Sequence, residues 1–192
     1  MSRFLATILS VVIIQAASAF AAVSPEADPA LCCQASEHVE YLLDRRGDHP
    51  ELSGGVVRHL TYKPLATFYE ARDFGLLWQT EAGLHPAAGQ LVEHLRAAAE
   101  HGLCSDAYLL GELESLLAIH EDLSRDGLGL TPFYQAMMDL YLTQAFFSYA
   151  THLIEGQVDP SLAHVDWRAR LRRADLTKLL GYAIENNRLD QV

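Results

Sequence analysis

Positive charge is scarce in this sequence. Its 192 residues include 14 lysines and arginines but 25 aspartates and glutamates, which gives a formal net charge of −11 at pH 7. A surface of that sign repels the phosphates of nucleic acid and of anionic lipid headgroups. We therefore expect no nucleic-acid partner for this chain.

Cysteine is almost lacking as well. The cysteines are Cys32, Cys33 and Cys104, and their odd number leaves at least one unpaired. A bridge from the Cys32/Cys33 pair to Cys104 is one alternative, and free buried thiols are the other. A bridge within the adjacent pair would be strained.

Motifs that carry chemistry are missing too. No Glu lies three residues before any of the nine histidines, which excludes the Glu-x-x-His pair of carboxylate-bridged metal bundles, and there is no His-Glu-x-x-His. There is also no Gly-x-Ser-x-Gly nucleophile elbow, and we interpret Cys104, in HGLCSD, as a small buried residue after a helix stop. We expect no metal site, no cofactor and no catalytic residue.

Glu70 and Asp139 are the acids that we expect to be least solvated. A buried acid of raised pKa would suit glycosidic chemistry, so a small secreted helical glycan-cleaving enzyme is an alternative function. For Asp139 the pattern favours another role, because a carboxylate inside an apolar helix needs a cation or a backbone donor as its partner.

The first residues have the pattern of a secretory signal peptide. MSRFLATILSVVIIQAASAFA has an early Arg3, an apolar run through Ile14 and a small-x-small ending, which predicts cleavage after Ala21. An uncleaved membrane anchor is the alternative, although the run is short for a span. Removal of residues 1–21 would take the net charge to about −12. The prediction places the mature chain in the periplasm.

The apolar spacing of the remaining chain predicts an all-α protein with a single compact multi-helix domain. Residues 22–61 are expected to form a leader with a short helix from Ser36 to Arg46 and a loop, and residues 62–192 the domain. No alternating strand pattern of useful length is present. The expected helices of the domain run from Pro64 to Asp73, from Pro86 to a stop at Gly102, from Asp106 (with Ser105 as N-cap) to about Leu123, from Thr131 to Gly156, and onward from Asp175.

The stretch from Thr131 to Gly156 is the helix around which we expect the others to pack. Thr131 can act as N-cap, Pro132 suits the first helical position, and Gly156 suits a left-handed C-terminal stop. Its apolar residues point in most directions around the axis, which is typical of a buried helix. The length would also suit a membrane span, but polar residues such as Gln135 and Asp139 disfavour insertion.

Three motifs follow one another along the chain. They are FYEARDFGLLW at residues 68–78, GLHPAAGQLVEHLRAAAEHGLCSDAY at residues 83–108, and MDLYLTQAFFSYATHLIEGQVDP at residues 138–160. Together they resemble the scaffold domain of large periplasmic L,D-transpeptidases, whose first signature is Phe-Tyr-x-x-Arg-x-Phe-x-x-Leu-Trp. The resemblance implies structural positions at Tyr69, Arg72, Phe74, Trp78, His101, Gly102, Asp139, Gly156, Asp159, Pro160 and Trp167.

The chemistry of these residue types agrees with structural roles. Tyr69 and Trp78 are large aromatic side chains that can fill a helix junction, and Arg72 can satisfy carbonyl groups at a helix end or pair with a buried acid. We expect this role for them rather than glycan binding.

The resemblance also carries an expectation about function. In that family the scaffold precedes a peptidoglycan-binding-like region and a catalytic domain with a Ser-His-Gly-Cys motif, which this sequence lacks. It therefore implies a non-catalytic scaffold module linked to peptidoglycan cross-linking. Its partner would be a separately encoded catalytic domain, another envelope protein or peptidoglycan itself. The last helix has no stop signal before Val192, which favours a truncated or split member.

Overall fold

The structure is a computed structural model that describes residues 29–44, 62–80, 83–156 and 174–189. The predicted all-α class is confirmed: these residues are mainly helical, with one hairpin of very short strands. The predicted signal peptide and the motif residues Asp159, Pro160 and Trp167 lie outside the described residues. In chain order the elements are α1 (Pro29–Asp44), α2 (Tyr62–Glu70), β1 (Gln79–Thr80), β2 (Gly83–Leu84), α3 (Pro86–Arg96), the 3₁₀ helices η3 (Ala97–His101) and η4 (Ser105–Tyr108), α4 (Leu110–Arg125), α5 (Pro132–Glu155) and α7 (Leu176–Asn186).

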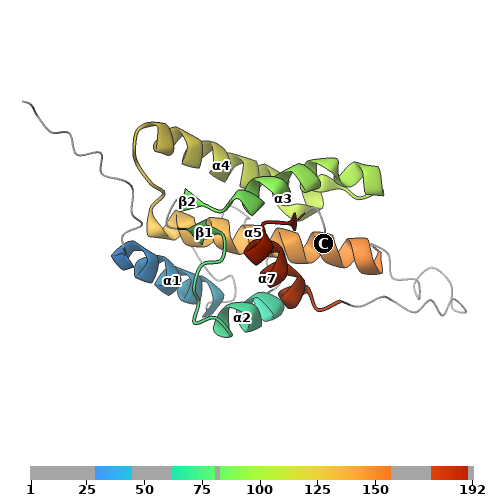
Figure 1. Cartoon of the computed structure of the whole chain (residues 1–192), viewed down its shortest axis with the longest axis horizontal. Helices are drawn as coiled ribbons and strands as arrows, with labels where there is room; N and C mark the ends of the chain where they lie inside the picture. Colours follow the sequence, from blue (N-terminus) through green and yellow to red (C-terminus); the bar gives the residue numbers. More distant parts are fainter. Residues whose placement is uncertain (1–28, 45–61, 81–82, 157–173, 190–192) are drawn as a thin grey trace, which may run out of the picture.

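α5 is the central helix of the fold, as the sequence predicts. It runs through the middle of the molecule, with α3 and α4 on one side and α1 and α2 on the other, and α7 crosses in front of it (Figure 1). Every residue from Ala136 to Phe147 is buried, so the helix is covered around its whole circumference. None of the described helices, α5 included, combines the length and the apolar character needed to cross a membrane.

Both predicted ends of α5 are confirmed, although the details of capping differ. Thr131 precedes the helix in an extended conformation and Pro132 takes the first position, but the Thr131 side chain makes no cap hydrogen bond. Gly156 ends the helix with φ 87° and ψ 159°. Its φ is positive as predicted, but its ψ is extended, so it is not the left-handed helical stop that we expected.

α1 packs along α5 and contributes to the core. Ala35, Val39, Leu42 and Leu43 are buried, and the last three belong to the same hydrophobic cluster as the central helix. The helix begins seven residues before the predicted start at Ser36 and ends at Asp44 rather than Arg46. The residues that the sequence groups with the leader thus include one face of the core.

α2 ends earlier than predicted because two residues adopt positive φ. The helix stops at Glu70, whereas the sequence predicts an end at Asp73. Asp73 and Phe74 have φ of 52° and 56°, a conformation that interrupts a right-handed helix. The turn leads to Leu77 and Trp78, which are buried, and then to the hairpin of β1 and β2.

Another left-handed residue, Leu109, divides the helix predicted from Asp106 to about Leu123. η4 ends at Tyr108, and Leu109, with φ 58°, separates it from α4. Ser105 is the first residue of η4 rather than its N-cap, so that prediction is wrong. The break turns two consecutive side chains, Tyr108 and Leu109, into the core, which a continuous helix would place on different faces.

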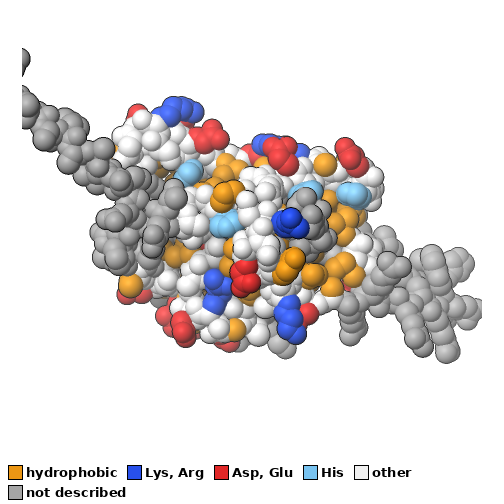
Figure 2. All heavy atoms as spheres, in the orientation of Figure 1, with side chains coloured by type: hydrophobic (Ala, Val, Ile, Leu, Met, Phe, Trp, Pro, Cys, Tyr) orange, Lys and Arg blue, Asp and Glu red, His pale blue; other side chains and the backbone are white. Residues whose placement is uncertain are grey.

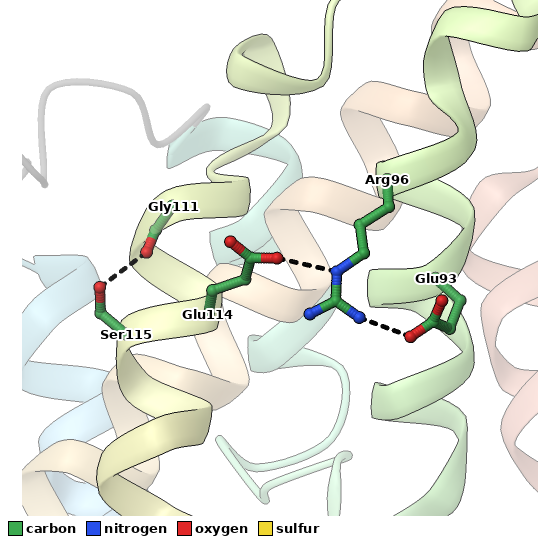
Figure 3. Close-up of polar contacts among 5 residues, drawn as sticks. All are labelled: Glu93, Arg96, Gly111, Glu114 and Ser115. Atoms are coloured by element: carbon green, nitrogen blue, oxygen red, sulfur yellow. Dashed lines mark hydrogen bonds and ion pairs between the residues drawn. The ribbon is translucent and has the colours of Figure 1, made fainter.

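An ion pair on the outer surface joins α3 to α4. Arg96 of α3 donates to Glu114 of α4 at 2.8 Å and also pairs with Glu93 one turn earlier (Figure 3). All three side chains are exposed, so each pair contributes roughly 0–1 kcal/mol. The apolar residues beneath them hold the two helices together.

α7 has clear signals at both ends. The Asp175 side chain accepts from the backbone N–H of Lys178, as a predicted N-cap should. Asn187, with φ 49° and ψ 44°, ends the helix, and its N–H donates to the carbonyl groups of Ala183 and Ile184. The expectation of a last helix without a stop is therefore wrong, because Asn tolerates the left-handed conformation that a helix end requires.

Candidate functional site

A buried carboxylate lies at the junction of α2, the turn after it, and α5. Asp139 is 0% exposed. Its Oδ1 accepts from the Tyr69 hydroxyl at 2.6 Å and from the Leu77 backbone N–H at 3.0 Å. Its Oδ2 accepts from the same Leu77 N–H at 3.0 Å and from the Trp78 N–H at 2.8 Å. Both oxygens are thus occupied by donors from α2 and the turn.

Thr143 extends this arrangement one helical turn along α5. Its Oγ1 accepts from the Trp78 indole Nε1–H at 2.9 Å and lies 2.8 Å from the Tyr69 hydroxyl. We call the side chains of Tyr69, Trp78, Asp139 and Thr143, with the N–H groups of Leu77 and Trp78, the Asp139 network. It ties three separate parts of the chain together inside the core.

The charge in this network is held without an ion pair. The ion pairs of the described residues are all on the surface, and none involves Asp139. Burial raises the pKa of Asp139 from 3.8 to about 6, while the hydrogen bonds from Tyr69, Leu77 and Trp78 and the charge of Arg72 act in the opposite direction. Burial, followed by the nearby Asp139 charge, raises the pKa of Tyr69 well above its ordinary value.

Arg72 makes its hydrogen bonds to the turn and acts on the carboxylate only through its charge. Its Nε donates to the Gly75 carbonyl at 2.9 Å, and Nη2 lies 3.5 Å from the Leu76 carbonyl. The guanidinium carbon lies 5.3 Å from the centroid of the Phe68 ring, within cation–π range. Arg72 therefore closes the turn that presents the Leu77 and Trp78 amides to Asp139.

The amino-acid sequence that forms this network matches a known protein family. A family model described as Scaffold domain matches residues 63–192. The chain belongs to the Scaffold domain family. No curated protein and no solved structure matched it. The matched range begins in α2 and contains every residue of the Asp139 network, so the network is an internal part of the scaffold domain.

The remaining motif residues of the scaffold domain lie outside the network. Phe74 is half-buried at positive φ in the turn after α2. His101 is exposed at the end of η3, and Gly102, with φ 73°, closes that helix. Gly156 ends α5. The motif positions therefore comprise one buried cluster and several separate helix ends.

Three residues lie elsewhere than predicted. Glu70 is exposed at the last position of α2, so its selection as a poorly solvated acid is wrong. Cys33 and Cys104 are free thiols and both are exposed, not buried. Leu103 turns into the core beside Cys104, because the chain is extended there and successive side chains point to opposite sides. The Cys32 side chain lies outside the described residues.

The sequence predicts a cation or a backbone donor as the partner of Asp139, and the structure has backbone donors, but sequence reasoning identified neither these two N–H groups nor the joint role of Thr143. Asp139 and Thr143 are four residues apart, so they share one face of a helix that is otherwise apolar there. That spacing is a usable signal for a buried polar cluster. The N–H groups of Leu77 and Trp78 have no such signal, since every residue except proline carries one. Among the described residues, no group of three or more His, Cys, Asp or Glu side chains could hold a metal ion.

The scaffold domain also has an open groove between α2, α5 and the start of α7. Its volume is about 780 Å³. Phe68 and Phe147 contribute aromatic surface, with ring centroids 5.5 Å apart, and Gln144, which donates to Ser148 at 2.6 Å, contributes polar groups. Hydrophobic side chains also gather on the surface around α7 and the adjoining part of α5 (Figure 2). This side of the scaffold domain therefore combines apolar and hydrogen-bonding surface.

Proposed function

We propose that this chain is a scaffold module of the L,D-transpeptidase type, which serves peptidoglycan cross-linking by holding a partner in position. The observation that carries the proposal is the Asp139 network. Tyr69 and Trp78 come from one motif and Asp139 from another, about sixty residues further along the chain, and the first two bond to Asp139 at 2.6 and 2.8 Å inside the core. Motif residues that bond to one another in a closed interior serve to fix a shape.

The proposal assigns chemistry to the partner rather than to this chain. Acyl transfer by a thiol requires a thiolate, a base to activate it and donors for the oxyanion. Cys104 is an exposed residue before η4, and we assign it no catalytic role. The partner would be a separately encoded catalytic domain or another protein of the cell envelope, which the predicted signal peptide would allow this chain to meet in the periplasm.

We propose the loop between α4 and α5 as one contact for the partner. Asp126 to Gly129 are exposed, and the Leu128 side chain is 59% exposed. An exposed apolar side chain on a loop fixed between two long helices presents a defined anchor at low entropic cost.

Incubation of the purified mature chain with tetrapeptide-bearing muropeptides tests the positional role. We expect no cross-linked product from the chain alone. Cross-linking that disappears in a Cys104→Ala variant would overturn the proposal, because it would show that this chain supplies the nucleophile.

Binding to a Ser-His-Gly-Cys catalytic domain encoded in the same genome tests the partner. We expect association, weakened about tenfold or more by Leu128→Asp, which places a charge at the anchor. Ala118→Asp is the matched control, because Ala118 is exposed on α4 away from the loop. Equal losses in the two variants would remove the loop from the proposal.

A further inference from the structure

We propose that the Asp139 network is a proton-responsive latch, in which one proton at Asp139 sets how firmly the turn from Ala71 to Trp78 is held against α5. The proposal rests on the contacts of the network and is independent of the scaffold function. It concerns local opening of the turn, which exposes the carboxylate and the amides bonded to it.

The first argument is that, among the described residues, no cation bonds directly to the buried carboxylate. Tyr69, from α2, is the titratable group in direct contact with Asp139, and Arg72 acts on it only through its charge. The Arg72 guanidinium is bonded to carbonyl groups of the turn instead. The other helices that pack on α5 contribute apolar side chains to the shared core, including Val39 of α1, Leu91 of α3, Leu113 of α4 and Leu180 of α7.

The second argument is that Asp139 can accept a proton without placing two hydrogen-bond donors opposite each other in the network. In the ionised form the Tyr69 O–H donates to Oδ1 of Asp139. When solvent supplies one proton to Oδ1, that O–H can donate to the Tyr69 oxygen over the same 2.6 Å. The Tyr69 O–H then rotates to Thr143 Oγ1 at 2.8 Å or to the Asp139 carbonyl at 3.1 Å. The Leu77 and Trp78 amides keep Oδ2 as their acceptor.

The direction of the effect follows from hydration. Opening the turn returns Asp139 to water, where its pKa is about 3.8, whereas in the closed network burial raises the pKa to about 6. A raised pKa means that the closed state binds the proton more tightly than the open state does. Opening is therefore hardest below pH 3.8, and it becomes easier as pH rises through 6. Between pH 4 and 7.5 the opening constant should increase about 50-fold.

Hydrogen exchange of the Leu77 and Trp78 amides in the full chain measures this opening. After correction for intrinsic exchange, we expect the opening constant of both amides to rise about 50-fold from pH 4 to 7.5. In Asp139→Asn, which has no titrating group at this position, the increase should be less than twofold. Asp175→Asn is the matched control, because Asp175 is an exposed acid at the start of α7, and it should keep the full increase.

A direct titration keeps the proposal testable even if Asp139→Asn does not fold. The carboxyl ¹³C resonance of Asp139 in the unaltered chain should titrate with a midpoint near 6. Tyr69→Phe, which removes a donor to the ionised form, should raise that midpoint. A midpoint below 4.5, or an opening constant of Leu77 that does not change with pH, would overturn the latch.

Discussion

Thr143 joins the two aromatic side chains of the Asp139 network at a single oxygen. It is 0% exposed, and its hydroxyl is the acceptor for the Trp78 indole N–H. A buried donor that loses its acceptor bears the full cost of desolvation, which exceeds the net gain of an average hydrogen bond. Thr143 therefore contributes to stability mainly because its removal would leave the Trp78 indole N–H buried without an acceptor.

Thr143→Val should destabilise the fold by about 1–3 kcal/mol, because the indole N–H of Trp78 would remain buried without an acceptor. Val has nearly the shape of Thr, so the change adds little cavity cost. Urea unfolding followed by circular dichroism measures the difference. Thr151→Val is the control, since the Thr151 hydroxyl bonds to the Phe147 carbonyl of its own helix. Equal losses in both variants would show that the network contributes nothing specific.

For single residues, the sequence predicts which of them need a polar partner better than it predicts which of them are exposed. The need of Asp139 for a partner and the ability of Arg72 to satisfy carbonyl groups both follow from residue type, and the structure has both. The exposure of Glu70 depends on the face it takes at the end of α2, and that of Cys104 on the side it takes in the extended segment before η4. That choice is set by neighbouring backbone angles, which residue type alone does not determine.

Positive φ angles define the ends of several elements. Asp73, Phe74, Leu109 and Asn187 adopt them without being glycine, which costs each about 1 kcal/mol or more. Hydrogen bonds repay part of this cost, as in the turn closed by Arg72. The sequence predicts α5 and the start of α3 because proline and glycine mark them, whereas it places the ends of α2 and η4 wrongly because no glycine stands there.

Glycine substitutions should distinguish a position that requires positive φ from one with ordinary helical angles. Gly102→Ala should destabilise the fold by about 1 kcal/mol, because Gly102 has φ 73°. Gly111→Ala should stabilise it by about 0.5–1 kcal/mol, because Gly111 is an exposed helical residue with nothing within 4 Å of an added Cβ. Thermal unfolding of both variants checks the signs. The same sign for both would contradict the backbone assignment.

The whole molecule is organised by a helix that is apolar on all sides. α5 needs a covering layer on each side, and the fold supplies α3 and α4 on one and α1 and α2 on the other, while α7 crosses in front of it (Figure 1). The all-α class and the central position of α5 follow from the sequence, because a helix with apolar residues all round its axis is typically a buried one. The inclusion of α1 does not, since a short amphipathic helix has the same pattern whether it packs on this core or on another surface.

Leu42→Ala should lower the free energy of unfolding by about 2–4 kcal/mol if α1 belongs to the core of the whole molecule. Leu42 is 3% exposed and lies on the helix that packs against α5. Leu153→Ala, the same change at a side chain that is 45% exposed, should cost about 0.5 kcal/mol or less. Chemical denaturation of the full chain provides both values. A loss below 1 kcal/mol at Leu42 would show that α1 is dispensable.

The burial of α5 on all sides between Ala136 and Phe147 also has a kinetic consequence. A helix with a single apolar stripe can bury that stripe against one partner before the other helices pack. α5 has apolar surface on all sides, so one layer alone removes only part of that surface from water. Partial assemblies would leave one apolar side of α5 in water, so they should be sparsely populated. We therefore expect the helices to assemble in one cooperative step, with folding and unfolding each following a single exponential.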